Sequence, residues 1–396
     1  MKEIIINKEQ EQTQILLLDN HELVEKYTES NKKNRIEGNI YVGEVKDVLQ
    51  GMQAAFINIG LKKNTFIHLK DALPKVDVAK GQPNIESKSV KTVLKPGMPI
   101  LVQVKKDFTN SKGAKVSTHI SLNSRYIVFM PDTDIITISK KIEDETERKR
   151  LMTVAKTHLP KNCGAIIRTA AVGKSEESIK EDIAVCTEKW EKINKIYQDV
   201  VKNKKYPKLV YKTHGIVKKL LLDLMDKDLE TVIVNSKEDY DYIVKMMQDF
   251  NVKNIQVKYV EGDILEGKVD LNKQIEKAEN RRVWLKCGGF IAIDKTEALT
   301  AIDVNSGKYI GKDNAEATVF KVNKQASVEI AKQLRLRDIG GIVIIDYIDM
   351  QLEESKQKIV EILEKELSKD RSKTQVVGFS KLNLLEMTRK HICSNE

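Results

Sequence analysis

The sequence predicts a multi-domain protein of mixed α/β and α+β class, and three observations support this prediction. The chain has 396 residues, too many for one compact core, which favours about two to four domains. Short apolar segments recur at regular spacing between residues 38 and 121, a pattern typical of a small β-barrel. After residue 215, apolar segments alternate with amphipathic stretches, a pattern typical of an α/β sheet with helices packed on it.

Two segments far apart in the sequence are predicted to form parts of one sheet. Within residues 1 to about 35, two apolar runs, Ile4–Ile6 and Ile15–Leu18, are separated by a polar turn, which predicts a β-hairpin too small to fold alone. Residues 215 to 275 predict helix, strand, helix and strand in succession, with no loop long enough to be a linker. We therefore expect these two segments to contribute to one sheet.

The remaining elements follow from the same signals. Residues 122 to about 214 mix two strands, YIVFM and AIIRTA, with a long charged helix from about Glu176 to Lys202, which predicts an α+β insertion. The barrel strands are expected in NIYVGEVKDVL, MQAAFINIG, NTFIHL, PILVQVKKD and AKVSTHISL. The last segment predicts a hairpin around Gly288 and Gly289, the strand ALTAIDVNSG, a helix near Asn314 to Arg337, the buried strand GGIVIIDYIDM and a final amphipathic helix.

Composition indicates a folded protein with a polyanionic partner. Apolar residues make up 41% and charged residues 32% of the chain, enough for buried cores and a solvated surface. Lys and Arg exceed Asp and Glu by 68 − 58 = +10 and recur along the whole chain, which favours nucleic acid over a membrane as partner. The first ten residues do not resemble a signal peptide and no window reaches the length of a membrane span, so we expect a cytoplasmic protein. Four scattered cysteines predict reduced thiols, since they form no Cys-x-x-Cys zinc or redox motif: Cys163, Cys186, Cys287 and Cys393.

Two carboxylates and an amide form the strongest candidate for a catalytic site. Asp303 and Asn305 lie two residues apart on one predicted strand, so their side chains leave the same face of the sheet. Asp346 ends the next apolar strand, and ligand sites of α/β sheets lie at such carboxyl ends. Either aspartate alone could instead cap a turn. Asp349 is predicted as a helix N-cap and Asp294 as a turn residue.

This constellation predicts a magnesium site. Two neighbouring carboxylates repel each other unless one is protonated or a cation lies between them. Oxygen ligands without nearby His or Cys suit Mg²⁺, with Mn²⁺ as the alternative.

The predicted barrel carries features of an RNA-binding surface. Phe56 shares a strand face with Asn58, and Phe66 shares one with His68, while the isoleucines between them point the other way. Exposed rings stack on bases and lysines bind phosphates, so single-stranded RNA is the predicted ligand of Phe56, Phe66, His68, Lys106 and Lys112. The alternative is that both phenylalanines belong to the barrel core.

Arg168 and Thr169 follow a predicted strand and could bind a terminal phosphate, although such a pair is often only part of the surface. The nearby VGKS sequence lacks the earlier glycine and the loop of a P-loop, which excludes a nucleoside triphosphatase of that kind.

Several long motifs together resemble the ribonuclease E/G family, from about residue 2 to residue 392. They are MQAAFINIGL, KGAKVSTHISLNSRYIVFMP, IIRTAAVG, ALTAIDVNSGK, QLRLRDIGGIVIIDYIDM and LLEMTRK. The resemblance implies a ribonuclease H-like domain in two parts (1–36 and 215–278), an inserted OB-fold RNA-binding barrel (37–121), a 5′-sensor domain (122–214) and a deoxyribonuclease I-like catalytic domain (279–396).

The resemblance also implies roles for the candidate residues. Asp303 and Asp346 match the family's metal ligands, and Asn305 matches the residue that supports them. Phe56, Phe66 and Lys112 match its RNA-binding barrel. A pocket that senses a 5′-monophosphate would comprise Ser124, Arg168, Thr169 and Lys373. The implied activity is magnesium-dependent cleavage of single-stranded A/U-rich RNA in ribosomal RNA processing and messenger RNA decay, leaving 5′-phosphate and 3′-hydroxyl ends.

The sequence departs from the family pattern at three places. Ser124 stands where the family often has glycine, and Lys373 where it often has arginine; lysine lacks the fork of arginine, so weaker sensing is expected. The sequence ends at Glu396 without the Cys-Pro-x-Cys link through which family subunits share zinc. Two interpretations stay open: the sequence is a truncated form, or the protein dimerises without the shared zinc. We expect a homodimer, and a tetramer is disfavoured because the small C-terminal domain is also absent.

Two other functions remain open from the sequence. A non-catalytic RNA-binding scaffold would explain the barrel and the charge, but not the carboxylates. A deoxyribonuclease could use the same metal pair. Cleavage of matched RNA and DNA with magnesium or a chelator distinguishes these alternatives.

Overall fold

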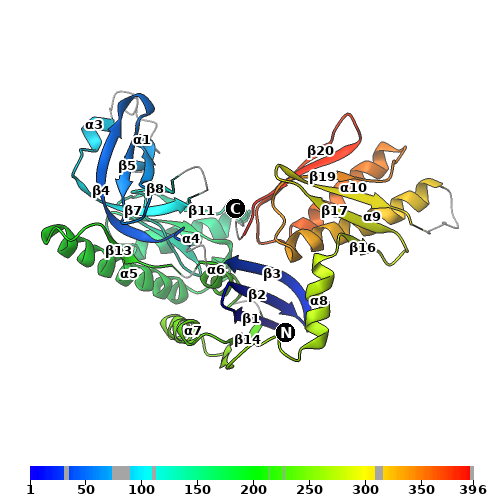
Figure 1. Ribbon diagram of the computed structural model, residues 1–396, viewed down its shortest axis with the longest axis horizontal. Coiled ribbons are helices and arrows are strands. Elements are labelled where there is room, and N and C mark those ends of the chain that lie inside the picture. Colours follow the sequence, from blue (N-terminus) through cyan, green and yellow to red (C-terminus); the bar gives the residue numbers. More distant parts are fainter. Residues whose placement is uncertain are drawn as a thin grey trace. The chain divides into compact units, whose positions relative to one another are not determined.

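The structure is a computed structural model, and it describes residues 1–30, 35–73, 90–108, 113–213, 215–225, 228–307 and 315–392. The chain forms two compact units, and many of their helices and strands are labelled in Figure 1. The first unit comprises residues 1–32, 228–244 and 253–396, and the second comprises residues 33–227 and 245–252. The predicted mixed α/β character is confirmed, while the names and boundaries of the five predicted domains stay predictions.

The first unit contains a five-stranded sheet with strand order β15-β14-β1-β2-β3. β1 pairs in parallel with β14 and antiparallel with β2, so the two segments predicted to share a sheet do so. The sequence did not predict the third N-terminal strand, because its few buried apolar residues, Leu23 and Tyr27, lie among mostly polar ones. The strands are β1 (Lys2–Lys8), β2 (Gln12–Asp19), β3 (Glu22–Ser30), β14 (Leu229–Val234) and β15 (Gln256–Tyr259).

The first unit also contains a six-stranded sheet with strand order β16-β17-β18-β19-β21-β20. Ile302 and Val304 of β18 point into a core that includes residues of helices α9 and α10, whereas Asp303 between them is exposed. We call the side of this sheet that carries Asp303 the outer face. The elements are β16 (Arg282–Trp284), β17 (Phe290–Lys295), β18 (Leu299–Asn305), α9 (Ala315–Leu336), β19 (Gly341–Asp346), α10 (Glu353–Leu367), β20 (Thr374–Phe379) and β21 (Leu384–Arg389).

The two sheets of the first unit are packed together. Leu336 at the end of α9 lies in one hydrophobic cluster with Ile5, Leu16 and residues of α8 (Val269–Glu279). Arg371 forms an ion pair with Glu25 of β3, and burial together with the charge of Arg389 lowers the pKa of Arg371 to about 10. The sheet that bears the candidate metal ligands is therefore fixed to its neighbour.

The second unit contains the predicted barrel. Five strands close in the order β4-β5-β6-β8-β7, with β4 pairing antiparallel to β7, and β13 adds to β4 outside the ring. Its interior is apolar and includes Val45, Ile57 and Ile67. The elements are β4 (Ile40–Leu49), β5 (Ala54–Asn58), β6 (Thr65–His68), α1 (Leu69–Ala72), α3 (Val90–Val93), β7 (Pro99–Lys106), β8 (Lys115–Ser117) and β13 (Lys208–Tyr211).

A four-stranded sheet in the order β11-β12-β10-β9 completes the second unit. Two helices pack on it, and the second, α5, covers the range predicted for the long charged helix. Helix α6 belongs to this unit, and helix α7 spans the boundary between the units. The elements are β9 (Leu122–Asn123), β10 (Ile127–Pro131), β11 (Ile136–Ile138), α4 (Glu145–His158), β12 (Cys163–Ile167), α5 (Glu176–Lys202), α6 (Gly215–Leu224) and α7 (Lys237–Asp249).

Cys163, Cys186 and Cys287 are free thiols, and Cys393 lies outside the described residues. Within the described ranges, we find no helix with the length and apolar character needed to span a membrane.

Candidate active site and RNA-binding surface

Asp303 and Asp346 lie directly opposite each other on adjacent parallel strands. Asp303 is the fifth residue of β18, Asp346 is the last residue of β19, and the two form a register pair. Both side chains are exposed on the outer face. The local sequence explains this, because the alternation of apolar and polar residues in β18 buries Ile302 and Val304 and turns Asp303 outward.

Asn305 lies on the same face and holds one of the two carboxylates. Its Nδ2 donates a hydrogen bond of 2.6 Å to Oδ2 of Asp303. The turn at Gly289 fixes the strand end, since a Cβ at this position would lie 2.7 Å from the carbonyl oxygen of Asn305. The structure therefore brings together all three residues that the sequence predicts for the catalytic site.

The two carboxylates repel each other. Partial burial raises the pKa of Asp346 above its ordinary value, and the negative charges of Asp303 and Asp349 raise it further. Asp349 was predicted as a helix N-cap, and this is wrong, because α10 begins at Glu353 with Leu352 as N-cap. Instead, Asp349 adds negative charge near Asp346. The sequence did not predict that Asp349 lies near Asp346, because the loop after β19 determines the position of Asp349.

Asp294 was predicted as a turn residue, and this is also wrong. It lies in β17 and accepts two hydrogen bonds of 2.6 Å from Arg281. These bonds and the charge of Asp294 raise the pKa of Arg281, to which Asp303 also contributes. Asp294 is thus neutralised by its own partner.

The donor set suits a metal that needs few protein ligands. Within the described residues, no group of three or more His, Cys, Asp or Glu side chains is arranged to hold a metal ion. Asp303 and Asp346 therefore offer two carboxylates. Mg²⁺ is commonly bound through one or two carboxylates together with water and the phosphates of a substrate, so these residues fit it.

The barrel presents a group of aromatic rings. Phe56 of β5 and Phe66 of β6 form a register pair with ring centroids 5.9 Å apart, and Phe66 contacts His68 at 4.6 Å. All three side chains are partly exposed, whereas Ile57 and Ile67 are fully buried. The alternation expected from the sequence is therefore present, and the phenylalanines are not in the barrel core.

Basic residues lie beside these rings. Lys106 is exposed at the end of β7 and pairs in register with Lys115 of β8, which is itself the register partner of Phe66. Lys112 lies outside the described residues. The sequence did not single out Lys115, because only the pairing of β6 with β8 brings it next to Phe66. Lys115 also forms an ion pair of 2.8 Å with Asp71.

The guanidinium of Arg168 is already engaged within the second unit. It donates a hydrogen bond of 2.8 Å to the carbonyl oxygen of Ser124 and forms an ion pair with Asp223 of α6. Thr169, the next residue, is exposed. The sequence did not predict the partner Asp223, which lies 55 residues away in the chain.

Ser124 is buried, and its hydroxyl donates a hydrogen bond of 2.6 Å to Oδ1 of Asp182. Burial raises the pKa of Asp182, although its hydrogen bonds to Ser124 and to the backbone of Tyr126 act in the opposite direction. Lys373 belongs to the first unit and is exposed there. Within the second unit, the predicted sensing residues thus comprise the exposed Thr169, the ion-paired Arg168 and the buried Ser124.

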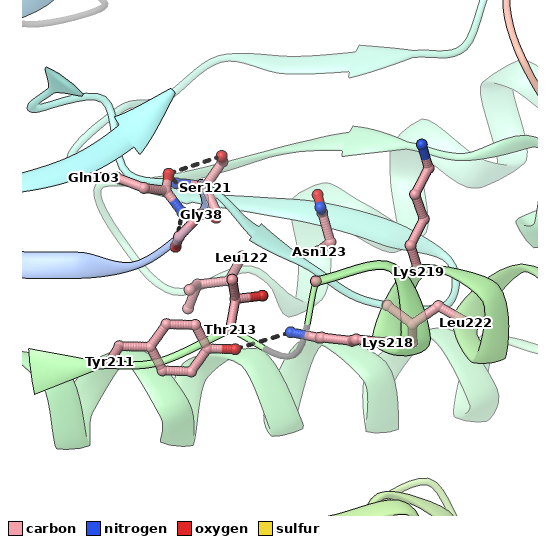
Figure 2. Close-up of a pocket in the computed structure, with 11 residues that line it drawn as sticks. Gly38, Gln103, Ser121, Leu122, Asn123, Tyr211, Thr213, Lys218, Lys219 and Leu222 are labelled. Carbon is pink, nitrogen blue, oxygen red and sulfur yellow. Dashed lines mark hydrogen bonds between the residues drawn. The ribbon is translucent and has the colours of Figure 1, made fainter. Parts of the chain in front are cut away.

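A small cavity of about 60 Å³ lies between the barrel and α6, and its lining includes Leu122 and Asn123, which precede Ser124 in the chain. Figure 2 shows its lining, in which Lys218 donates a hydrogen bond of 2.9 Å to the hydroxyl of Tyr211 and Gln103 contacts Ser121. The lining of this cavity comes from four separate segments of the chain, so the local sequence pattern did not predict it.

Comparison with known proteins supports the motif resemblance. The model of the ribonuclease E/G family matches residues 121–392. Ribonuclease G of Escherichia coli (strain K12) is 37% identical over 408 aligned residues, which cover the whole chain and 82% of that protein. Ribonuclease G of Haemophilus influenzae is 36% identical over 98% of this chain and 79% of its own length. Ribonuclease E of Nostoc sp. (strain PCC 7120) is 33% identical over 95% of this chain and 55% of its own length. The chain therefore belongs to the ribonuclease E/G family.

Proposed function

We propose that this protein is a magnesium-dependent endoribonuclease of the cytoplasm that cleaves single-stranded, A/U-rich RNA and leaves 5′-phosphate and 3′-hydroxyl ends. The class of enzyme follows from membership in the ribonuclease E/G family. Processing of ribosomal RNA and decay of messenger RNA are the proposed roles, with a homodimer as the active form and a 5′-monophosphate as a stimulating group.

One observation carries the proposal: Asp303 and Asp346 are register partners, and Asn305 holds Asp303 by a hydrogen bond of 2.6 Å. These two carboxylates would hold Mg²⁺. When bound, the ion supplies a Lewis acid for a phosphate oxygen and lowers the pKa of water. Asn305 keeps the carboxylate of Asp303 in one orientation, and the exposure of both aspartates leaves room for a phosphodiester.

The barrel supports RNA as the substrate. Phe56 and Phe66 are partly exposed rings on neighbouring strands. Lys115 lies on β8, next to the strand of Phe66, and Lys106 lies on β7, the strand beyond β8. Rings accept bases by stacking and ammonium groups bind phosphates, so this surface suits a single strand whose bases are not paired. Thr169 and Arg168 would contact a 5′-phosphate once Arg168 leaves Asp223.

The decisive experiment compares Asp303→Asn with Asp294→Asn. Both remove one carboxylate from adjacent strands of the same sheet, but Asp294 already has Arg281 as its partner. We expect Asp303→Asn to abolish magnesium-dependent cleavage of a single-stranded RNA while RNA binding is retained, and Asp294→Asn to cleave normally. Undiminished cleavage by Asp303→Asn would refute the assignment.

The alternative function is a non-catalytic RNA-binding scaffold, which the aromatic barrel surface alone would serve. It predicts that the unmodified protein binds RNA but does not cleave RNA or matched DNA with magnesium. Cleavage of the DNA in preference to the RNA would instead identify a deoxyribonuclease.

A further inference from the structure

A pair of aromatic rings lies on the same face of the six-stranded sheet as the candidate metal ligands. Trp284 of β16 is 66% exposed, unusual for so large an apolar side chain. Its ring centroid lies 5.3 Å from that of Phe290 on β17, which is partly exposed and lies outside the core cluster of this sheet. The sequence assigned neither ring a function.

The strand register ties this pair to the proposed catalytic site. Trp284 is the register partner of Phe290, and Phe290 is the register partner of Asn305. Paired residues lie on the same side of a sheet, so the two rings and the Asn305 amide form one row across the outer face. Strands are about 4.8 Å apart, which puts the Trp284 strand about 10 Å from the Asn305 strand.

A second row carries the charges. Arg282, Ala292, Asp303 and Asp346 are successive register partners across four strands. The guanidinium of Arg282 lies 5.2 Å from the centroid of the Phe290 ring, and in the described structure no carboxylate pairs with it. The outer face therefore offers carboxylates for a metal, a cation and two rings beside each other.

We infer that Trp284 and Phe290 form a stacking platform for a nucleobase that flanks the scissile phosphate, and that Arg282 binds the adjoining phosphate. The inference rests on the proposed function, because it takes Asp303 and Asp346 as the point of cleavage. The occupant follows from the chemistry: a base has an apolar face for the rings, and its phosphate complements the cation. Trp284 is thus a substrate-positioning residue beside the metal site.

Fluorescence tests binding independently of cleavage. The chain contains two tryptophans, so Trp190→Phe leaves Trp284 as the only reporter. In the full-length Trp190→Phe, Asp303→Asn protein with magnesium, a short single-stranded RNA should quench the Trp284 emission. The control is the Trp284→Phe, Asp303→Asn protein, which retains Trp190. The same titration of this protein should quench its emission less. Absence of Trp284 quenching while the RNA is bound would overturn the inference.

Kinetics test the consequence for cleavage. Trp284→Ala should lower kcat/KM for a single-stranded RNA by about 5- to 150-fold, the range that loss of one stacking ring produces, and Trp284→Phe should retain most of the activity. The matched control is Tyr259→Ala, which truncates an exposed ring on the other sheet of the same unit. In a series of RNAs, a single abasic position is placed at successive sites along the strand. The unmodified protein should lose activity when the missing base is the one that flanks the cleavage site and stacks on Trp284. Trp284→Ala should lose no further activity with that RNA.

The remaining outcomes are also decisive. If Trp284→Ala cleaves normally but converts a dimer to a monomer in solution, the rings form a contact between two copies of the chain and the inference is wrong. If Asp303→Asn still cleaves while RNA quenches Trp284, the proposed metal site fails and the stacking platform stands. Melting temperatures near that of the unmodified protein establish that the variants are folded.

Discussion

Asp303 and Asp346 are register partners on parallel strands, so that two like charges stand side by side on an exposed sheet face. Such a pair destabilises the fold unless a proton or a cation lies between the carboxylates. Partial burial raises the pKa of Asp346, and the repulsion from Asp303 raises it further. Metal binding and proton binding therefore compete for the same position.

The first prediction concerns pH. Because the pKa of Asp346 is raised in the folded protein, its protonation stabilises the fold, and this contribution is lost as pH rises through the raised pKa. Without a metal, Asp346→Asn should therefore melt at a higher temperature than the unmodified protein at neutral pH. With Mg²⁺ the order should reverse, because only the unmodified protein gains stability from the ion.

The same competition should appear in binding. Mg²⁺ affinity, measured by calorimetry, should fall as pH decreases through the raised pKa of Asp346. The control is Asp294→Asn, which should follow the unmodified protein, since Asp294 is paired with Arg281. A magnesium affinity that stays constant until the ordinary pKa range of aspartate would contradict this prediction.

A second prediction concerns Asn305, which supports the proposed metal ligand Asp303 and is not itself proposed as a ligand. Its amide donates to Oδ2 of Asp303 at 2.6 Å. Loss of such a supporting hydrogen bond typically costs about 10- to 100-fold in metal affinity or activity. We expect Asn305→Ala to lower cleavage by this factor and to raise the magnesium concentration needed for half-maximal activity. If saturating magnesium does not restore any of the activity, Asn305 acts on the substrate and not through Asp303.

The sequence predicted the placement of Asp303, Asn305 and Asp346 on one sheet face because this geometry depends on local strand patterns; their role as a metal site stays a prediction. Asp303 and Asn305 are two residues apart on a strand of alternating burial, and Asp346 ends a continuous apolar run. Both facts are visible in the order of residues. The barrel rings were predictable for the same reason, since Phe56 and Phe66 alternate with buried isoleucines.

Features that depend on packing between distant segments were not predictable. Asp349 precedes a helix by a few residues, and only the structure shows that α10 begins at Glu353 and that Leu352 is the N-cap. The ion pair of Arg168 with Asp223 joins segments 55 residues apart. Nothing in the local pattern of either residue indicates the other.

A third prediction concerns the barrel. Phe66 contacts both Phe56 and His68, so its ring is central to the aromatic group. Stacking of one base contributes about 1–3 kcal/mol, and Phe66→Ala should therefore raise the Kd for single-stranded RNA by about 5- to 150-fold. Phe66→Tyr keeps the ring and should bind nearly normally. Fluorescence anisotropy with a labelled RNA measures both, and unchanged binding by Phe66→Ala would exclude this surface as the RNA site.

The last prediction concerns sensing of the RNA 5′ end. Arg168 forms an ion pair with Asp223, and both side chains are largely shielded from solvent. A 5′-phosphate must compete with this carboxylate for the guanidinium. Hydrogen bonds to charged groups contribute about 1.5–3 kcal/mol, so Asp223→Asn should increase the preference for a 5′-monophosphate over a 5′-hydroxyl RNA by about tenfold or more. The preference is the ratio of kcat/KM values for two otherwise identical RNAs.

Two variants make this comparison specific. Arg168→Ala should bring the ratio to one, because no guanidinium remains for the phosphate. Asp249→Asn removes another ion pair of the second unit, with Lys189 at 3.6 Å, and should leave the ratio unchanged. An unchanged ratio in Asp223→Asn, with Arg168→Ala still lowering it, would mean that Asp223 orients the guanidinium for the phosphate. The carboxylate would then assist sensing, and Asp223→Ala should weaken it.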